Sequence, residues 1–129
     1  MTLHVDVVSP DRILWSGEAN MVIARTVGGG DIAFLTGHTP FVGALDVSVV
    51  TIRSDAGDQV VAVHGGFVEV SNDNVTVLSD VAELAGQIDV ARANELQAWA
   101  EERLRHEPDA DAESALARAR VRLDVASVA

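Results

Sequence analysis

Short runs of apolar, mostly β-branched residues alternate with turn residues through the first two-thirds of the chain. The clearest run, 47–53, reads VSVVTIR, and the first run ends at Pro10-Asp11, where proline fixes φ and the aspartate side chain bonds nearby backbone. Turn signals recur about every eight to twelve residues and separate about eight to ten expected strands. Many short strands with regular turns are typical of a sandwich. We therefore predict a β-sandwich over residues 1–86.

Clusters of glycine, proline and small polar residues mark where the expected strands end. They lie at 16–17, 28–31, 36–40, 54–58, 65–66 and 71–74. The cluster at 54–58 is expected to close a hairpin, and the glycine pair at 65–66 is expected to form a bulge or a tight turn.

After residue 86 the apolar residues recur at spacings of three and four, which is typical of amphipathic helices. We expect a first helix over 89–106, with Asp89 as its N-cap. Pro108 ends it, because the residue before proline is driven out of the α region. Asp111 is expected to cap a second helix, with Glu113 in its first turn.

The second helix is expected to be held weakly by its small side chains. Its expected buried face consists of Ala112, Ala115, Leu116, Ala119, Leu123 and Ala126. Arg118, Arg120 and Arg122 are expected to lie elsewhere on this helix. The short connection favours an antiparallel hairpin over residues 87–129, and alanine-lined faces bury little apolar area. Such a hairpin needs the sandwich, a partner or a ligand to hold it, and is a candidate for a mobile element.

The net charge of this 129-residue chain limits the kinds of partner that it can bind. Its net charge is −11, and it has nine arginines but no lysine, which argues against nucleic acid as a partner. Residues 1–86 have a net charge of −8 and residues 87–129 a net charge of −3. The acidic first part either suits a basic partner or serves solubility alone.

Several classes of function are excluded by what the sequence lacks. It contains no cysteine, no signal peptide and no apolar run as long as a membrane span, so we expect a soluble, intracellular protein. The four histidines, at positions 4, 38, 64 and 106, show no metal-ligand spacing. No activated serine motif is present, and the glycines at 28–30 precede a strand, unlike a phosphate loop. We expect neither a metal site nor an enzyme.

One constellation remains, at the start of the first expected helix. The residues are Ile88, Asp89, Arg92 and Ala93, and they place a carboxylate and a guanidinium on one helical turn. They indicate either a capped helix start with a surface arginine or an anion site at a helix N-terminus. The residues alone leave both interpretations open.

Six short motifs follow one another along nearly the whole chain. They are VVSPD at 7–11, WSG at 15–17, DIAFLTGHTP at 31–40, GGFVEV at 65–70, VTVLSD at 75–80 and IDVARA at 88–93. Each motif is weak alone, but their order and spacing resemble the epsilon subunit of rotary F-type ATP synthases. That resemblance implies the same β-sandwich followed by a C-terminal helical hairpin.

The resemblance also implies partners and sites. It implies a non-catalytic subunit of the central stalk, peripheral to the cytoplasmic face of the bacterial plasma membrane. The sandwich is expected to bind the gamma subunit and the c-ring, with Asp31 and His38 in the loop region that faces them. The hairpin is expected to regulate ATP hydrolysis, and in some members of the family it extends along the gamma subunit and blocks rotation in the hydrolysis direction. The alpha and beta subunits are expected as further partners of the C-terminal helices. No cofactor is required, but Ile88, Asp89, Arg92 and Ala93 become candidates for a regulatory ATP site.

Three departures from the family pattern affect these expectations. Ala33-Phe34 and Thr36 replace the usual glycine and proline of the docking loop. Trp99 takes the place of a basic residue about two turns beyond Arg92, which removes a cation that a triphosphate would use. The alternative hypothesis is a free-standing β-sandwich interaction module whose helices form a dimerisation arm.

Overall fold

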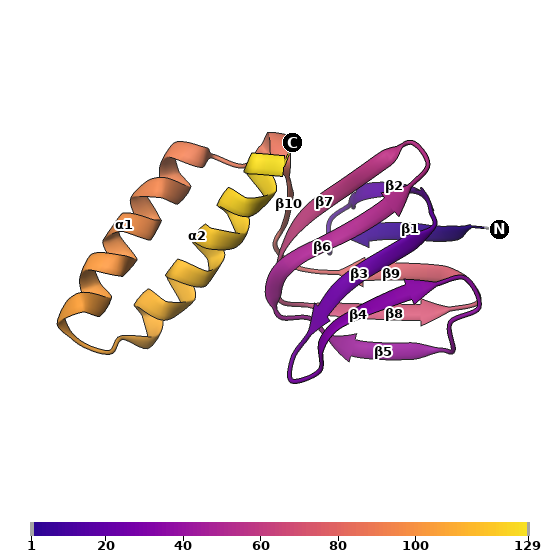
Figure 1. Ribbon diagram of the computed structural model, residues 1–129, viewed down its shortest axis with the longest axis horizontal. Helices are drawn as coiled ribbons and strands as arrows, with labels where there is room; N and C mark the ends of the chain where they lie inside the picture. Colours follow the sequence, from indigo (N-terminus) through magenta and orange to yellow (C-terminus); the bar gives the residue numbers. More distant parts are fainter. Residues whose placement is uncertain (1, 129) are drawn as a thin grey trace.

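The computed structural model describes residues 2–128 and contains a two-sheet β-sandwich followed by two helices (Figure 1). One sheet has the order β2 (Ile13–Ala19), β1 (Leu3–Val8), β9 (Asn74–Leu78), β8 (Phe67–Ser71) and β5 (Phe41–Ala44). The other has the order β10 (Ala82–Leu84), β7 (Gly57–His64), β6 (Val47–Ser54), β3 (Met21–Thr26) and β4 (Gly30–Leu35). The predicted sandwich and its number of strands are confirmed.

Alternation along the strands builds the core between the two sheets. In β1, Leu3, Val5 and Val7 are fully buried while the residues between them face outward. Phe34 is the largest of the fully buried side chains, and most of the others are valines. Valine suits this position because its β-branched side chain packs well on a pleated surface. The β1–β9 pair is parallel, and the other pairs are antiparallel.

The strand break expected at residues 16–17 is wrong, because β2 runs through it from Ile13 to Ala19. Ser16 and Gly17 pair with Asp6 and Val5 of β1, and Ser16 Oγ donates to Asp6 Oδ1 at 2.6 Å. The indole of Trp15 lies where a Cβ on residue 17 would project. Glycine at this position therefore makes room for a neighbouring side chain and does not end the strand.

The helical hairpin consists of α1 (Val90–His106) and α2 (Ala110–Val128). A short 3₁₀ helix, η1 (Ala85–Gln87), precedes it. The Asp89 carboxylate accepts a hydrogen bond from the Arg92 backbone, which confirms the predicted N-cap. The cap expected for the second helix is wrong: Asp109 Oδ1 accepts from the backbone nitrogens of Asp111 and Ala112.

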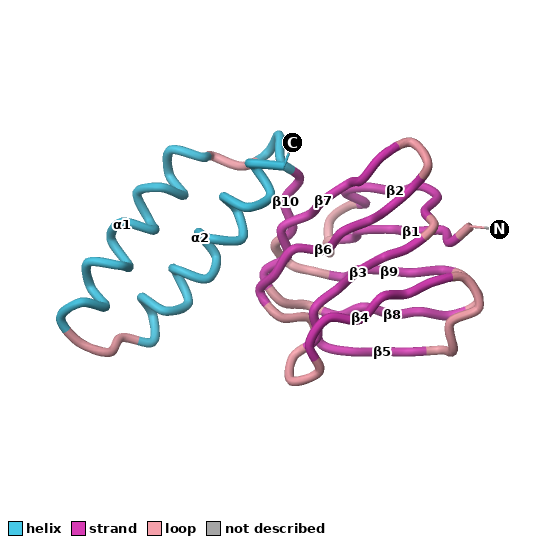
Figure 2. The backbone as a smooth tube through the Cα atoms, viewed as in Figure 1, coloured by secondary structure: helices cyan, strands magenta, loops and turns pink. Residues whose placement is uncertain are grey.

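Only α2 packs extensively on the sandwich, and α1 packs mainly on α2 (Figure 2). Val121 and Val125 of α2 are buried against Val60 and Ala62 of β7. The other side of α2 carries Ala112, Ala115 and Leu116, which meet Leu96, Ala100 and Leu104 of α1. The second helix thus buries two faces, whereas the predicted single face included Leu123 and Ala126, which are only partly buried. No helix in residues 2–128 is long and apolar enough to span a membrane.

Candidate functional site

A cavity of ≈ 670 Å³ opens between the start of α1, the strand β10 and the second half of α2. Its lining is mostly charged and comes from four elements and the residues between them. The lining residues are Glu83, Gln87, Asp89, Arg92, Ala93, Glu95, Leu96, Arg118 and Arg122. None of these side chains is a nucleophile of the serine or cysteine type. The described residues also contain no group of three or more His, Cys, Asp or Glu side chains arranged to hold a metal ion.

The motif at the start of α1 is divided between this cavity and the apolar packing beside it. Asp89, Arg92 and Ala93 line the cavity. Asp89 Oδ1 lies 3.0 Å from the Arg92 backbone nitrogen, so the carboxylate holds the first turn in place. Ile88 instead packs against the apolar cluster between α2 and β7. Three of the four predicted site residues therefore meet at one site, and the fourth supports it.

Two arginines of α2 complete the cationic side of the cavity and were missed as site residues. Arg118 and Arg122 are four residues apart, so both project from the same side of the helix. That spacing was visible in the sequence, but which side of α2 faces the start of α1 depends on the hairpin geometry. Among residues 2–128, neither Arg92 nor Arg118 forms an ion pair within 4.0 Å, so their guanidiniums remain available to an anion.

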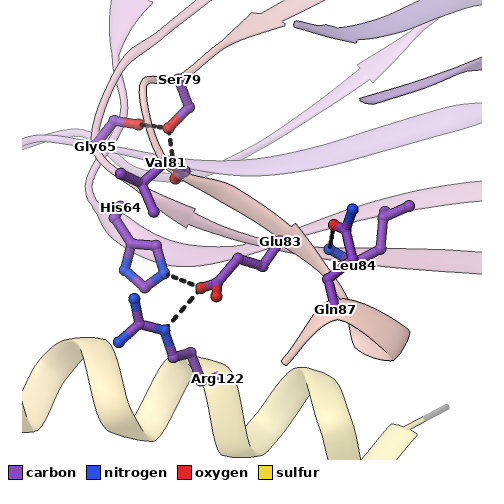
Figure 3. A network of polar contacts seen from close by, with 8 residues as sticks. All are labelled: His64, Gly65, Ser79, Val81, Glu83, Leu84, Gln87 and Arg122. Carbon is purple, nitrogen blue, oxygen red and sulfur yellow. Dashed lines mark hydrogen bonds and ion pairs between the residues drawn. The ribbon is translucent and has the colours of Figure 1, made fainter. Parts of the chain in front are cut away.

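The third cavity arginine belongs to a polar network that joins the hairpin to the sandwich (Figure 3). Arg122 Nε donates to Glu83 Oε1 at 2.7 Å, and His64 Nε2 lies 2.9 Å from the same oxygen. Burial alone would raise the pKa of Glu83, but the hydrogen bonds from Arg122 and His64 outweigh it and hold the pKa below the ordinary value. Glu83 is therefore ionised at neutral pH.

The two residues expected at the docking surface lie at different places on the sandwich. Asp31 lies inside β4, paired with Arg25 of β3 at 2.9 Å, so the expectation of a loop position for it is wrong. It extends the strand because it pairs in register with Arg25. His38 follows the other end of β4, with its ring 5.0 Å from Phe34 and 6.4 Å from Phe41. Edge strand β4 therefore separates them.

The geometry defines a class of protein: a β-sandwich that carries a helical hairpin, with a cavity between them lined by arginines and carboxylates. Family models match both parts. The model "ATP synthase, Delta/Epsilon chain, beta-sandwich domain" matches residues 2–85, and "ATP synthase, Delta/Epsilon chain, long alpha-helix domain" matches residues 87–127.

Individual relatives agree with the family models. The ATP synthase epsilon chain of Streptomyces griseus is 46% identical over 127 residues, covering 98% of this chain and 96% of that one. That of Halalkalibacterium halodurans is 43% identical, covering 97% of each chain. A chain in the cryo-EM structure of the Euglena gracilis mitochondrial ATP synthase shares the fold, with a TM-score of 0.71 at 18% identity, over 98% of this chain and 78% of that one. The protein belongs to the ATP synthase delta/epsilon chain family.

Proposed function

We propose that this protein is a non-catalytic subunit of the central stalk of a rotary ATP synthase. In this proposal residues 1–86 dock on the gamma subunit and the c-ring, and residues 87–129 regulate ATP hydrolysis. The observation that carries the proposal is the similarity to ATP synthase epsilon chains over nearly the whole length of the chain. The unequal attachment of the hairpin supports the regulatory part, because only α2 has extensive contacts with the sandwich.

We propose that the protein lies at the periphery of a membrane-bound complex, on the cytoplasmic face of a bacterial plasma membrane. Asp31 and His38 are the proposed contact residues for the gamma subunit and the c-ring. Both are on or next to β4, an edge strand whose outer backbone groups are unpaired within its sheet. The proposed hairpin partners are the alpha and beta subunits.

Reconstitution of the complex tests the proposal. The full chain is expected to co-purify with the gamma subunit, and a chain lacking residues 87–129 is expected to co-purify as well. The shortened chain should alter the ATPase activity of the complex, because it lacks the regulatory part. Circular dichroism of the shortened chain checks that its sandwich is folded. A full chain that forms a homodimer and ignores the gamma subunit would support the dimerisation-arm alternative.

We further propose that the cavity is a regulatory site for ATP. Arg92 and Arg118 offer guanidiniums without ion-pair partners in the described chain, and the N-terminus of α1 adds backbone donors. The carboxylates of Glu83, Asp89 and Glu95 oppose a highly charged ligand, so we expect weak rather than tight binding.

Calorimetry of the isolated protein tests this site. Arg92→Ala is expected to reduce ATP affinity about tenfold, the effect of losing about 1.4 kcal/mol of charge-assisted hydrogen bonding. Arg120→Ala is the matched control, because Arg120 is an exposed arginine of α2 outside the cavity lining. If the parent protein does not bind ATP, the proposal of a nucleotide site is wrong, whereas the proposal of a central-stalk subunit is unaffected.

A further inference from the structure

A single carboxylate oxygen links the sandwich to the hairpin beside the apolar packing of α2 on β7. Glu83 Oε1 on β10 accepts a hydrogen bond from Arg122 on α2 and is the partner of His64 on β7 (Figure 3). We call these three residues the interface cluster. His64 is the most buried of them, with a side chain only 4% exposed, against 22% for Glu83 and 23% for Arg122. The polar contact between the hairpin and the sandwich therefore shares its carboxylate with a buried histidine.

The surroundings of the two ring nitrogens favour the neutral form of His64. A carboxylate only accepts hydrogen bonds, so Nε2 of His64 must carry the proton that points at Glu83. The other ring nitrogen, Nδ1, is buried and has no hydrogen-bond partner among residues 2–128. A neutral ring leaves only a lone pair there. A protonated ring would leave a buried N–H group without an acceptor, which is costly.

We propose that protonation of His64 releases the hairpin from the sandwich, so that the interface cluster is a proton-sensitive switch. Protonation would place a third cation in the interface that already holds Arg118 and Arg122 of α2, beside the carboxylate of Glu83. Lifting α2 removes both arginines and admits water to the interface. The undocked form accommodates the imidazolium at lower cost than the docked form does.

The charged groups that face His64 act in opposite directions. Arg118 and Arg122 of α2 disfavour a protonated ring, and Glu83 of β10 favours it. Burial, followed by the two arginines, lowers the pKa of His64 in the docked form, and the hydrogen bond to Glu83 opposes this only in part. Undocking takes the pKa back toward the ordinary value of about 6.5.

The lowered pKa of His64 determines how docking of the hairpin depends on pH. Because the docked pKa of His64 is depressed, the undocked form binds more protons as the pH falls through about 6.5, and docking weakens. Glu83 acts in the same sense at lower pH, since its docked pKa is also depressed and its contribution is lost below about pH 4.5. Each pKa unit by which docking lowers His64 shifts the docking equilibrium up to tenfold. The consequence for ATP hydrolysis rests on the proposed function, but the switch itself belongs to the isolated chain.

A distance measurement on the full chain tests the switch. The chain has no cysteine, so Ala56→Cys, in the β6–β7 turn, and Ser114→Cys, on α2, give two specific labelling positions. Energy transfer between the labels should stay constant above about pH 7 and fall between about pH 6.5 and 5. In that background His64→Gln, which keeps a donor for Glu83 but does not titrate, should remove the fall. His106→Gln is the control, because its ring is exposed and bonds Glu102 within α1.

A transition that persists in His64→Gln, or its absence in the parent chain, would overturn the proposal. NMR titration of His64 in the unlabelled chain keeps the test decisive if that variant misfolds. The pKa of His64 should lie below the ordinary value of about 6.5 and should rise in Arg122→Gln. An ordinary pKa in the parent chain overturns the proposal. A chain that shows the transition but does not bind the gamma subunit would overturn the proposed function and leave the switch intact.

Discussion

Arg103 Nε donates a hydrogen bond of 2.8 Å to Asp109 Oδ2 across the loop that joins α1 to α2. The other oxygen of the same carboxylate accepts from the backbone nitrogens of Asp111 and Ala112, at 3.0 and 3.1 Å. One side chain thus caps the second helix and binds the last turns of the first. Because both helices meet at this carboxylate, it sets the geometry of the hairpin turn.

Replacement of Asp109 is expected to loosen the turn between the helices. Asp109→Ala removes the cap and the ion pair together, so the helical signal at 222 nm should melt several degrees earlier. Asp109→Asn keeps a capping oxygen but loses the charge, and should fall between the parent and the alanine variant. Asp111→Ala is the control, because Asp111 provides only its backbone nitrogen to this turn. Equal melting of the two alanine variants would contradict the assignment of the cap.

Acid should weaken the same turn. The hydrogen bond from Arg103, followed by those from the backbone of α2, lowers the pKa of Asp109 below its ordinary value of 3.8. A carboxylate with a depressed pKa in the folded state stabilises fully above its unfolded pKa and loses this effect as the pH falls through the folded value. Hairpin melting should therefore shift little between pH 7 and about 5, and decline below about pH 4. In Asp109→Asn the acid-dependent part of this decline should be smaller.

The attachment of α2 to the sandwich depends on the apolar packing of Val121 and Val125. Val125 is fully buried between α2 and the sheet, whereas Val128 of the same helix is 66% exposed. Val125→Ala should cost about 1–3 kcal/mol of docking free energy through lost burial and the cavity it leaves. Hydrogen exchange should then quicken in both helices before it does in the sandwich strands. Val128→Ala makes the same chemical change without burial and should leave exchange unaltered; a similar effect of both would argue against docking by packing.

The link between β7 and β8 passes from one sheet to the other and permits only glycine at position 66. Its φ is 111°, and a Cβ there would collide with the backbone of Leu78 and Ser79. Ser79 Oγ also donates to the Gly65 carbonyl at 2.9 Å, which holds the two segments together. Gly66→Ala should destabilise the fold by about 3 kcal/mol, measured by urea denaturation. Gly86→Ala meets no atom within 4 Å and should change stability by far less; comparable losses would contradict this account.

The sequence patterns predicted the elements of the fold better than they predicted the contacts between them. Period-two alternation in 47–53 identified β6, and Asp89 was identified as a cap because capping depends on neighbouring residues only. The cap on α2 was misplaced because Asp109 and Asp111 both precede an alanine-rich run, and Arg103 selects between them only in three dimensions. Local patterns cannot make that choice.

Only part of the candidate site could be predicted from the sequence, because local patterns do not specify contacts between distant elements. Asp89 and Arg92 are adjacent on one helical turn, so their proximity follows from the sequence. Arg118 and Arg122 approach them only because the hairpin folds back and α2 turns its arginines toward β10. His64 and Glu83 are 19 residues apart and meet through the register of β7 with β10, which no local pattern specifies.

Trp99 offers a test of how charge limits nucleotide binding at the cavity. It is half exposed on α1, two turns beyond Arg92 and one turn beyond Glu95 and Leu96, which line the cavity. Trp99→Arg should place a further guanidinium within reach of a triphosphate and offset the repulsion from Glu95, four residues earlier on the same helix. We expect about tenfold tighter ATP binding, equivalent to about 1.4 kcal/mol, by calorimetry. The gain should shrink at high salt, because screening weakens exposed charges.

Two further variants distinguish the effect of the added charge at position 99 from the effect of removing the indole. Trp99→Gln removes the indole without adding charge and should leave the affinity near that of the parent chain. Combining Trp99→Arg with Arg92→Ala should lose most of the gain, since both guanidiniums would act on the same ligand and their effects should be coupled. A gain that appears equally with glutamine would show that the indole obstructs the cavity, and the missing cation would then not be the limit on affinity.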